Sequence, residues 1–191
     1  MTWAFAPLQR AHYGAILCDP PWAFEAYRNK RAIAQRSAES HYQVETVDDL
    51  SRLPVLELAA RDCCLFMWAV DSHLDQAIAL MERWGFSYRT IAFVWVKTAQ
   101  DGTPRMGMGL WTRKQSEICI FGTRGEPRRQ GRGVRQVIMA PRREHSRKPD
   151  ETRERIQQLV NGPYCELFAR ESAPGWDSWG LEATKFDQVA A

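Results

Sequence analysis

Short apolar runs separated by polar segments dominate the hydrophobic pattern of this 191-residue chain. The first run, Ala15 to Cys18, stops at an aspartate followed by two prolines, which is typical of a buried strand that ends abruptly. Five later runs have the length and composition of strands. They lie at residues 63–70, 90–96, 118–121, 136–139 and 165–169.

Other segments have the spacing of helices. Between residues 72 and 84, apolar positions recur every three or four residues, and Gly85 follows, which predicts a helix that ends there. Pro149 precedes a charged segment, residues 150–160, whose apolar residues share one face. Thr46 begins a Thr-x-x-Asp spacing that predicts a further helix start.

Strands that alternate with helical segments predict an α/β protein with a central, mostly parallel sheet and helices on both faces. Such sheets bind ligands beyond the carboxyl ends of their strands, where Asp19 and Glu166 would both lie. Two glycine-rich basic segments, residues 98–110 and 122–133, are expected to form long loops around that site. We expect one domain, residues 1–191, without a separate target-recognition domain.

Composition and charge narrow the class of protein. No apolar run is long enough to cross a bilayer, and no secretory signal is visible, so we expect a cytoplasmic protein without membrane contact. Residues 124–148 hold nine arginines or lysines and two glutamates, within a net charge of +3. This stretch favours a phosphate-rich partner, although charge runs also occur on solvated faces. The cysteines, expected to be buried and reduced, are Cys18, Cys63, Cys64, Cys119 and Cys165.

The segment Asp19-Pro20-Pro21-Trp22 has the chemistry that N-methylation of adenine requires. The exocyclic nitrogen is a poor nucleophile because its lone pair is delocalised into the ring. A carboxylate and the Pro20 carbonyl can accept both amino hydrogens and turn the lone pair toward a methyl donor, while the prolines fix the turn. Trp22 offers a flat face for stacking of the base. The alternative is a rigid turn that ends a strand, with Trp22 as part of the core.

This segment resembles the signature of the MT-A70 family of adenine-N6 methyltransferases, and the resemblance extends over residues 14–182. It implies a Rossmann-like class I methyltransferase in permuted order, with the catalytic motif before the cofactor motif, and S-adenosylmethionine as the cofactor. The further matching stretches, in the order of the family, are His41-Tyr42, Leu65 to Trp68, Trp84 to Phe86, Phe93 to Thr98, Gly109 to Trp111, His145 to Glu151, Glu166 to Arg170 and Pro174 to Gly180.

The resemblance also implies which residues form the site. An acidic residue can accept ribose hydroxyls or the cofactor ammonium, and Arg170 can donate to hydroxyls or to the carboxylate. The alternatives are a solvated Lys148 at a helix start and a surface salt bridge of Arg170. The implied catalytic residues are Asp19, Pro20, Pro21 and Trp22. The implied cofactor-binding residues are Cys18, Asp19, Lys148, Glu166, Phe168, Arg170 and Glu182.

Two positions depart from the family pattern. Many members have Gly-Asn-Gln or Gly-Asn-Glu where this chain has Gly180 to Glu182. Leu181 therefore replaces a polar residue that resembles a contact to the cofactor ribose, while Glu182 can still bind hydroxyls. In larger members a lysine meets the cofactor carboxylate where this chain has Ser116, and Arg113 and Lys114 stand close by as candidate substitutes.

Substrate contacts are expected from aromatic and basic residues. Tyr42 and Trp111 are candidates to line the adenine pocket, with ordinary packing as the alternative for Trp111. The basic segments 28–36 and 124–143 are candidates for phosphate contacts. The individual candidates are Arg113, Lys114, Arg128, Arg129 and Arg132.

The expected substrate is nucleic acid, with DNA favoured over RNA because the short form resembles bacterial and phage members. A compact enzyme gains contacts from a second subunit, so we expect a homodimer or a heterodimer partner. No metal site is expected, because the four histidines lie far apart in the sequence. The alternative function is a non-catalytic nucleic-acid-binding subunit, although such members lose the acid or the aromatic of the catalytic turn.

Overall fold

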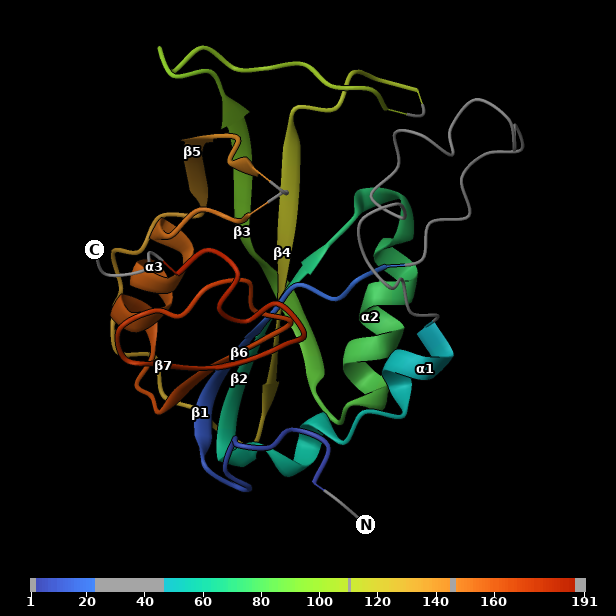
Figure 1. The fold of residues 1–191 in the computed structure, drawn as a ribbon, viewed down its shortest axis with the longest axis vertical. Helices are drawn as coiled ribbons and strands as arrows, with labels where there is room; N and C mark the ends of the chain where they lie inside the picture. Colours follow the sequence, from blue (N-terminus) through green and yellow to red (C-terminus); the bar gives the residue numbers. More distant parts are fainter. Residues whose placement is uncertain (1–2, 23–46, 110, 145–146, 188–191) are drawn as a thin grey trace.

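The computed structural model describes residues 3–22, 47–109, 111–144 and 147–187 (Figure 1). The elements, in chain order, are β1 (Tyr13–Cys18), α1 (Val47–Ser51), η2 (Val55–Glu57), β2 (Ala59–Ala69), η3 (Asp71–His73), α2 (Leu74–Arg83), β3 (Ser87–Thr98), β4 (Ser116–Arg124), β5 (Val137–Pro141), α3 (Glu151–Leu159), β6 (Tyr164–Leu167) and β7 (Trp176–Trp179).

The strands form one sheet in the order β5-β3-β4-β2-β1-β6-β7. β1 pairs in parallel with both β2 and β6, and β7 continues the parallel set beyond β6. On the other side, β4 is antiparallel to β2 and β3, and β5 is parallel to β3. Six of the seven described strands therefore run the same way, and β4 is reversed.

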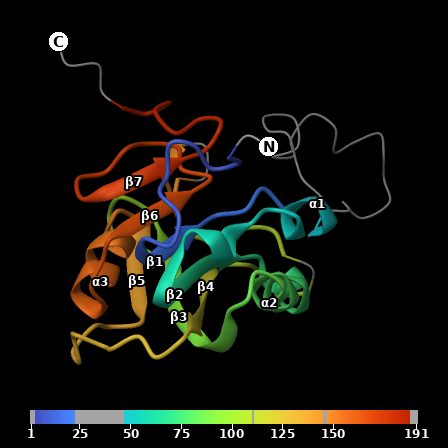
Figure 2. The same cartoon turned by 90° about the horizontal axis from the view of Figure 1, so that it is seen from below.

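Alternate side chains of the strands enter two hydrophobic cores, one on each face of the sheet. In β1, Ile16 and Cys18 lie in the core that α1 and α2 complete, whereas Ala15 and Leu17 lie in the core that Ile156 of α3 completes. Figure 2 shows α3 on one face and α1 and α2 on the other. Because both faces are covered, the strands appear in the sequence as continuous apolar runs.

The predicted α/β fold, with a mostly parallel sheet and helices on both faces, is confirmed. The helix of residues 72–84 begins as η3 and continues as α2, and Gly85 follows with φ +82°, a left-handed conformation that glycine adopts without strain. The apolar runs do not predict β7, because two polar residues separate Trp176 from Trp179 in a strand of four.

The two ends of the sheet carry different segments. Asp19 directly follows β1, and the long β3–β4 connection, residues 99–115, extends beyond the same carboxyl end (Figure 1). The reversed β4 carries the chain to the opposite, amino end, where Arg124 pairs with Cys63 near the start of β2. The prediction that residues 122–133 form a loop around the site is therefore wrong. The first of them belong to β4, and the others follow it at the amino end.

The five cysteines are all buried and free, as predicted. Burial raises the pKa of Cys18, Cys119 and Cys165 well above the ordinary value of a thiol, so these groups stay protonated. Among the described helices, none combines the length and the apolar character that a membrane crossing needs.

Trp84 should be among the residues on which stability depends most. Its ring is fully buried and its indole N–H donates to the Leu50 carbonyl at 2.9 Å, which joins the end of α2 to α1. Trp84→Ala should lower the free energy of unfolding by about 3–5 kcal/mol. Trp84→Phe keeps much of the ring and should cost less, about 1–3 kcal/mol, because it leaves the carbonyl without its donor. Urea denaturation measures both values.

Leu181→Ala is the control, because Leu181 is 91% exposed and its truncation should leave stability nearly unchanged. Equal losses for the alanine and phenylalanine variants of Trp84 would contradict the division into packing and hydrogen bonding.

Candidate active site

The end of β1 places Asp19 between two neighbouring strand ends. Cys18, the last residue of β1, pairs with Met67 in β2 and with Leu167 in β6. The residues that follow β1 and β6 therefore share one edge of the sheet, where α/β proteins bind their ligands. The Asp19 side chain is 19% exposed, so it lies at the border between the interior and solvent.

Hydrogen bonds hold the turn after Asp19 against β2. The Trp22 backbone N–H donates to the Pro20 carbonyl at 2.9 Å, and the Trp22 indole N–H donates to the Trp68 carbonyl at 3.2 Å. The Trp22 ring is 7% exposed and belongs to the core, so it does not present the open face that stacking of a base needs. A carbonyl oxygen has two lone pairs, so Pro20 can accept a second hydrogen bond.

Four charged side chains form a chain across this edge of the sheet. The Lys148 ammonium donates to Asp19 Oδ2 at 2.7 Å and lies 3.4 Å from Glu117 Oε2. Lys97 on β3 donates to Glu117 Oε1 on β4 at 2.5 Å. All four side chains are four-fifths buried or more. Each charge therefore lies next to an opposite one, which offsets the loss of hydration.

The alternation of charge also sets the pKa values. Burial alone would lower the pKa of Lys148, but the carboxylates of Asp19 and Glu117 outweigh burial and raise it above its ordinary value. Burial alone would raise the pKa of Glu117, but Lys148 and Lys97 outweigh it and lower that pKa to about 2. Lys148 and Glu117 are therefore both charged at neutral pH.

The turn after β6 brings a second set of groups to Asp19. Phe168 has φ +60°, a conformation that is rare for a bulky residue and is found mostly where surrounding structure enforces it. A Cβ on Gly180 would lie 2.8 Å from the Ala169 carbonyl oxygen, so the close approach of the two backbones requires glycine. The turn carries Arg170 to 4.0 Å from the Asp19 carboxylate.

Ion pairs tie this turn to the segment before α3 and to α3 itself. Glu171 pairs with Arg143, Arg147 and Arg153. Arg153 also donates to Glu166 at 2.7 Å. Burial raises the pKa of Glu166, and Arg153 opposes that shift in part. Glu166 is thus engaged by the protein itself and holds the turn beneath the expected cofactor position.

Two buried polar atoms beside this turn have no hydrogen-bond partner among the described residues. They are Ser178 Oγ on β7 and Glu182 Oε2 shortly after it. Buried polar atoms are normally paired, so these two can receive hydroxyl or amine groups of a ligand. With Arg170 as a donor to a carboxylate, they match the ribose, ammonium and carboxylate groups of S-adenosylmethionine. The residues present therefore fit this cofactor.

Three predicted contacts lie on the β3–β4 connection. Trp111 is 99% exposed, and Arg113 is exposed as well. Lys114 forms an ion pair with Asp71. In this arrangement Trp111 does not line a pocket formed by the described residues.

The remaining predicted residues are distributed more widely. The Cys18 side chain points into the core, so its backbone alone faces the site. Tyr42 and His145 lie outside the described residues. The structure places the three candidates for phosphate contacts at or near the amino end of the sheet, away from Asp19, because they follow the reversed β4. These are Arg128, Arg129 and Arg132.

Sequence reasoning missed Glu117 and Lys97. An acid at the start of an apolar strand is typical of a solvated face, and the resemblance of Phe93 to Thr98 to the family implies no role for Lys97. No local sequence pattern marks them, because the pairing of the sheet brings them together, Lys97 near the end of β3 and Glu117 near the start of β4. That position depends on the reversal of β4, which periodicity does not reveal.

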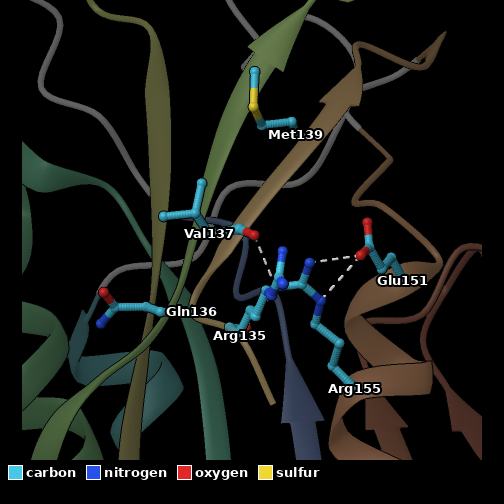
Figure 3. Close-up of a pocket in the computed structure, with 6 residues that line it drawn as sticks. All are labelled: Arg135, Gln136, Val137, Met139, Glu151 and Arg155. Atoms are coloured by element: carbon cyan, nitrogen blue, oxygen red, sulfur yellow. Dashed lines mark hydrogen bonds and ion pairs between the residues drawn. The ribbon is translucent and has the colours of Figure 1, made fainter. Parts of the chain in front are cut away.

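A cavity of about 580 Å³ opens elsewhere, along the exposed edge of β5 (Figure 3). Arg155 pairs with Glu151 and donates to the carbonyl oxygens of Arg135 and Val137. These two carbonyl oxygens are therefore not free to pair with a further strand at this edge. The predicted site residues do not line this cavity. Its lining residues are Arg135, Gln136, Val137, Met139, Glu151 and Arg155.

Comparison with known proteins gives the family. The MT-A70 family model matches residues 13–182. The chain is 35% identical to the type II methyltransferase M.MunI of a Mycoplasma species, over 93% of this chain and 81% of that protein. It is 31% identical to the human N(6)-adenosine-methyltransferase catalytic subunit METTL3, over 88% of this chain and 28% of that protein. It is 30% identical to an Arabidopsis thaliana N(6)-adenosine-methyltransferase MT-A70-like protein, over 88% of this chain and 23% of that one.

The chain thus spans most of the Mycoplasma relative and less than a third of the human and plant ones. The matched region includes the Asp19 turn, Lys148 and the turn after β6. The chain therefore belongs to the MT-A70 family of S-adenosylmethionine-dependent adenine-N6 methyltransferases.

Proposed function

We propose that the protein transfers a methyl group to the N6 amino group of adenine in nucleic acid, preferably DNA, with Asp19 as the catalytic residue. The observation that carries the proposal is the 2.7 Å hydrogen bond from Lys148 to Asp19 at the strand edge where Arg170 also lies. The family match supports the reaction, and this geometry supports the roles that we assign to the residues.

Asp19 and Pro20 accept the two hydrogens of the amino group. Lys148 occupies Asp19 Oδ2, and within the described ranges no residue bonds to Oδ1, which is left to meet the amino group. The Pro20 carbonyl already accepts one hydrogen bond, from Trp22, and its second lone pair is the other acceptor. Two acceptors held on a rigid turn direct the nitrogen lone pair away from themselves.

Lys148 holds Asp19 in one orientation. Its hydrogen bond to Oδ2 fixes the carboxyl group, so that the other oxygen stays available to the amino group. Glu117 in turn fixes Lys148, and Lys97 fixes Glu117. Asp19 is the catalytic residue of this group, and the other three are positioning residues.

The cofactor, when bound, supplies an electrophilic methyl group on its sulfonium. Arg170 and Glu182 hold its carboxylate and hydroxyl groups in this proposal, and the strained Phe168 turn sets where they stand. After transfer the methylated amino nitrogen is positively charged and must release a proton. In this proposal Asp19 Oδ1, which already accepts a hydrogen bond from the amino group, accepts that proton.

The burial of Trp22 favours an anchoring role over a stacking role. Its indole bond to Trp68 and its place in the core fix the turn on which Asp19 and Pro20 stand. Loss of this anchor would misplace both acceptors together.

The arrangement of the strands supports the permuted motif order and a single domain over residues 1–191. β1, which carries the catalytic turn, comes first in the chain, and β6, which carries the cofactor turn, lies beside it in the sheet but follows it by far in sequence. The match over 81% of a Mycoplasma type II methyltransferase favours the short bacterial form, and with it DNA.

The exposed apolar residues of the β3–β4 connection support a dimer in which a second copy of the chain covers them. Met106, Met108 and Trp111 are 72%, 89% and 99% exposed. The Gly107 N–H donates to the Lys114 carbonyl at 2.7 Å, so the connection has backbone order of its own. Large apolar side chains gathered on an ordered surface are typical of an interface.

Asp19→Ala should lower methyl transfer by at least about 100-fold, because the amino group loses one of its two acceptors. Labelled-methyl transfer to matched DNA and RNA oligonucleotides, with and without adenine, measures the loss, and wild-type turnover should be faster on DNA. Calorimetry should show cofactor affinity largely retained, since Asp19 contacts the amino group of the substrate. Turnover that persists in this variant would rule out the mechanism.

Glu117→Gln should lower kcat roughly 10- to 100-fold while cofactor affinity stays similar, because Lys148 loses one of the groups that position it. The pKa of Lys148 is raised by two carboxylates against burial, so removal of one lets that pKa fall. The decline of activity at high pH should therefore begin at a lower pH than in the wild type. Glu126→Gln, at the amino end of the sheet, is the control, and an unchanged pH profile in Glu117→Gln would contradict the positioning role.

Trp111→Ser combined with Met108→Ser should shift the protein from dimer to monomer, because the apolar contact is lost while the buried core is untouched. Sedimentation velocity across a range of concentrations measures the shift, and urea denaturation of the monomer checks the fold. A wild-type protein that is monomeric and fully active at every concentration would exclude the dimer.

A further inference from the structure

Four arginines after β4 form what we name the arginine ribbon: Arg128, Arg129, Arg132 and Arg135. All four side chains are exposed, and within the described residues none has an ion pair with an acid. Residues 124–135 contain five arginines and a single acid, Glu126. Most other arginines of the described chain are paired, so the ribbon is the place where unpaired guanidinium groups gather.

The backbone of the ribbon is fixed, so its side chains form a defined surface. The backbone N–H groups of Gln130 and Gly131 both donate to the Leu159 carbonyl at the end of α3, and Arg129 forms a β-bridge with Val160. A Cβ on Gly131 would lie 2.3 Å from the Gln158 carbonyl oxygen, so the close approach to α3 requires glycine. The Glu126 N–H donates to the Asp62 carboxylate at 2.8 Å, which fixes the backbone just before the ribbon.

The ribbon is distant from the catalytic turn. Arg124, just before it, pairs with Cys63, whereas Asp19 follows the residue that pairs with Met67. At about 3.3 Å per residue along a strand and about 4.8 Å between strands, the ribbon begins roughly 20 Å from Asp19. It cannot contact the phosphates next to an adenine held at Asp19.

The edge of the sheet offers a surface path from the ribbon to the carboxyl end, where β3, β4 and β2 separate β5 from β1. β5 runs from the end of the ribbon toward the carboxyl end, and the cavity of Figure 3 lies along it, with Val137 and Met139 exposed. Arg142, exposed, follows the end of β5. Cations therefore stand at both ends of an open, partly apolar edge. Phosphates would meet the cations, and the bases of an unpaired strand would meet the apolar part.

We propose that the arginine ribbon binds the phosphate backbone of the nucleic acid substrate some distance from the target adenine, and that the intervening strand follows the β5 edge. The proposal rests on the proposed function, which makes nucleic acid the substrate. Unpaired guanidinium groups bind phosphate through two parallel hydrogen bonds. The ribbon is thus an affinity surface and takes no part in methyl transfer.

Arg128→Gln with Arg132→Gln tests the ribbon on oligonucleotides of about 6 and about 30 nucleotides, each with one central adenine. Affinity for the long strand, measured by fluorescence anisotropy, should fall about 10-fold near 0.15 M salt, and the slope of log K against log salt should decrease by about 1.4. Affinity for the short strand and kcat at saturation should be unchanged. Arg52→Gln with Arg83→Gln removes the same charge just after α1 and at the end of α2, and should change neither the affinities nor kcat.

Equal losses for both strand lengths would overturn the proposal, because they would place the ribbon at the target nucleotide. No loss for either length would overturn it as well, and would leave the surface to another partner. Failure of the proposed function would give a different result. The wild-type protein would then transfer no methyl group to any adenine oligonucleotide, regardless of what the ribbon variants bind.

Discussion

The ion pair between Lys148 and Asp19 determines how this site is built. Two charges that are four-fifths buried lose most of their hydration, and their attraction offsets that loss only when further partners satisfy the remaining atoms. Glu117 and Lys97 supply those partners, so the four side chains stabilise one another. Removal of one leaves an uncompensated charge in the interior, which makes the chain of charges a single functional unit.

The same ion pair joins parts of the chain that are 129 residues apart. β1 lies between β2, from the N-terminal half of the chain, and β6, from the C-terminal half. The proposed catalytic turn after β1 therefore lies beside the proposed cofactor turn after β6. The ion pairs of Glu171 hold the second turn to the segment that carries Lys148. In the proposed site, the sheet and a few buried charges, among them Arg153 of α3, would align the substrate and cofactor groups.

The sequence predicts those features that follow from local physics. Runs such as Ala15 to Cys18 are recognisable as strands because both faces of the sheet are covered, and Gly85 marks a helix end because its φ is positive. Strand direction leaves no mark in periodicity, so the reversal of β4 was not predicted. That one omission affects the candidate site in two ways. Sequence alone does not bring Glu117 to the carboxyl end of the sheet, and it does not place the arginines after β4 at the amino end. The sequence alone does not decide whether Trp22 is buried, because an aromatic residue after two prolines can either stack on a base or pack in the core.

The reversal of β4 gives its two ends different roles. The strand begins at the carboxyl end of the sheet, where Glu117 can reach Lys148, and it ends at the amino end, where the arginine ribbon follows. A parallel strand in this position would have placed the basic segment beside Asp19, where several unpaired arginines would compete with Lys148 for the catalytic carboxylate. Separation by the length of a strand keeps the charge balance of the site neutral while the protein still presents a strongly basic surface. In the proposed function, affinity for nucleic acid and control of one buried carboxylate would therefore be adjustable independently.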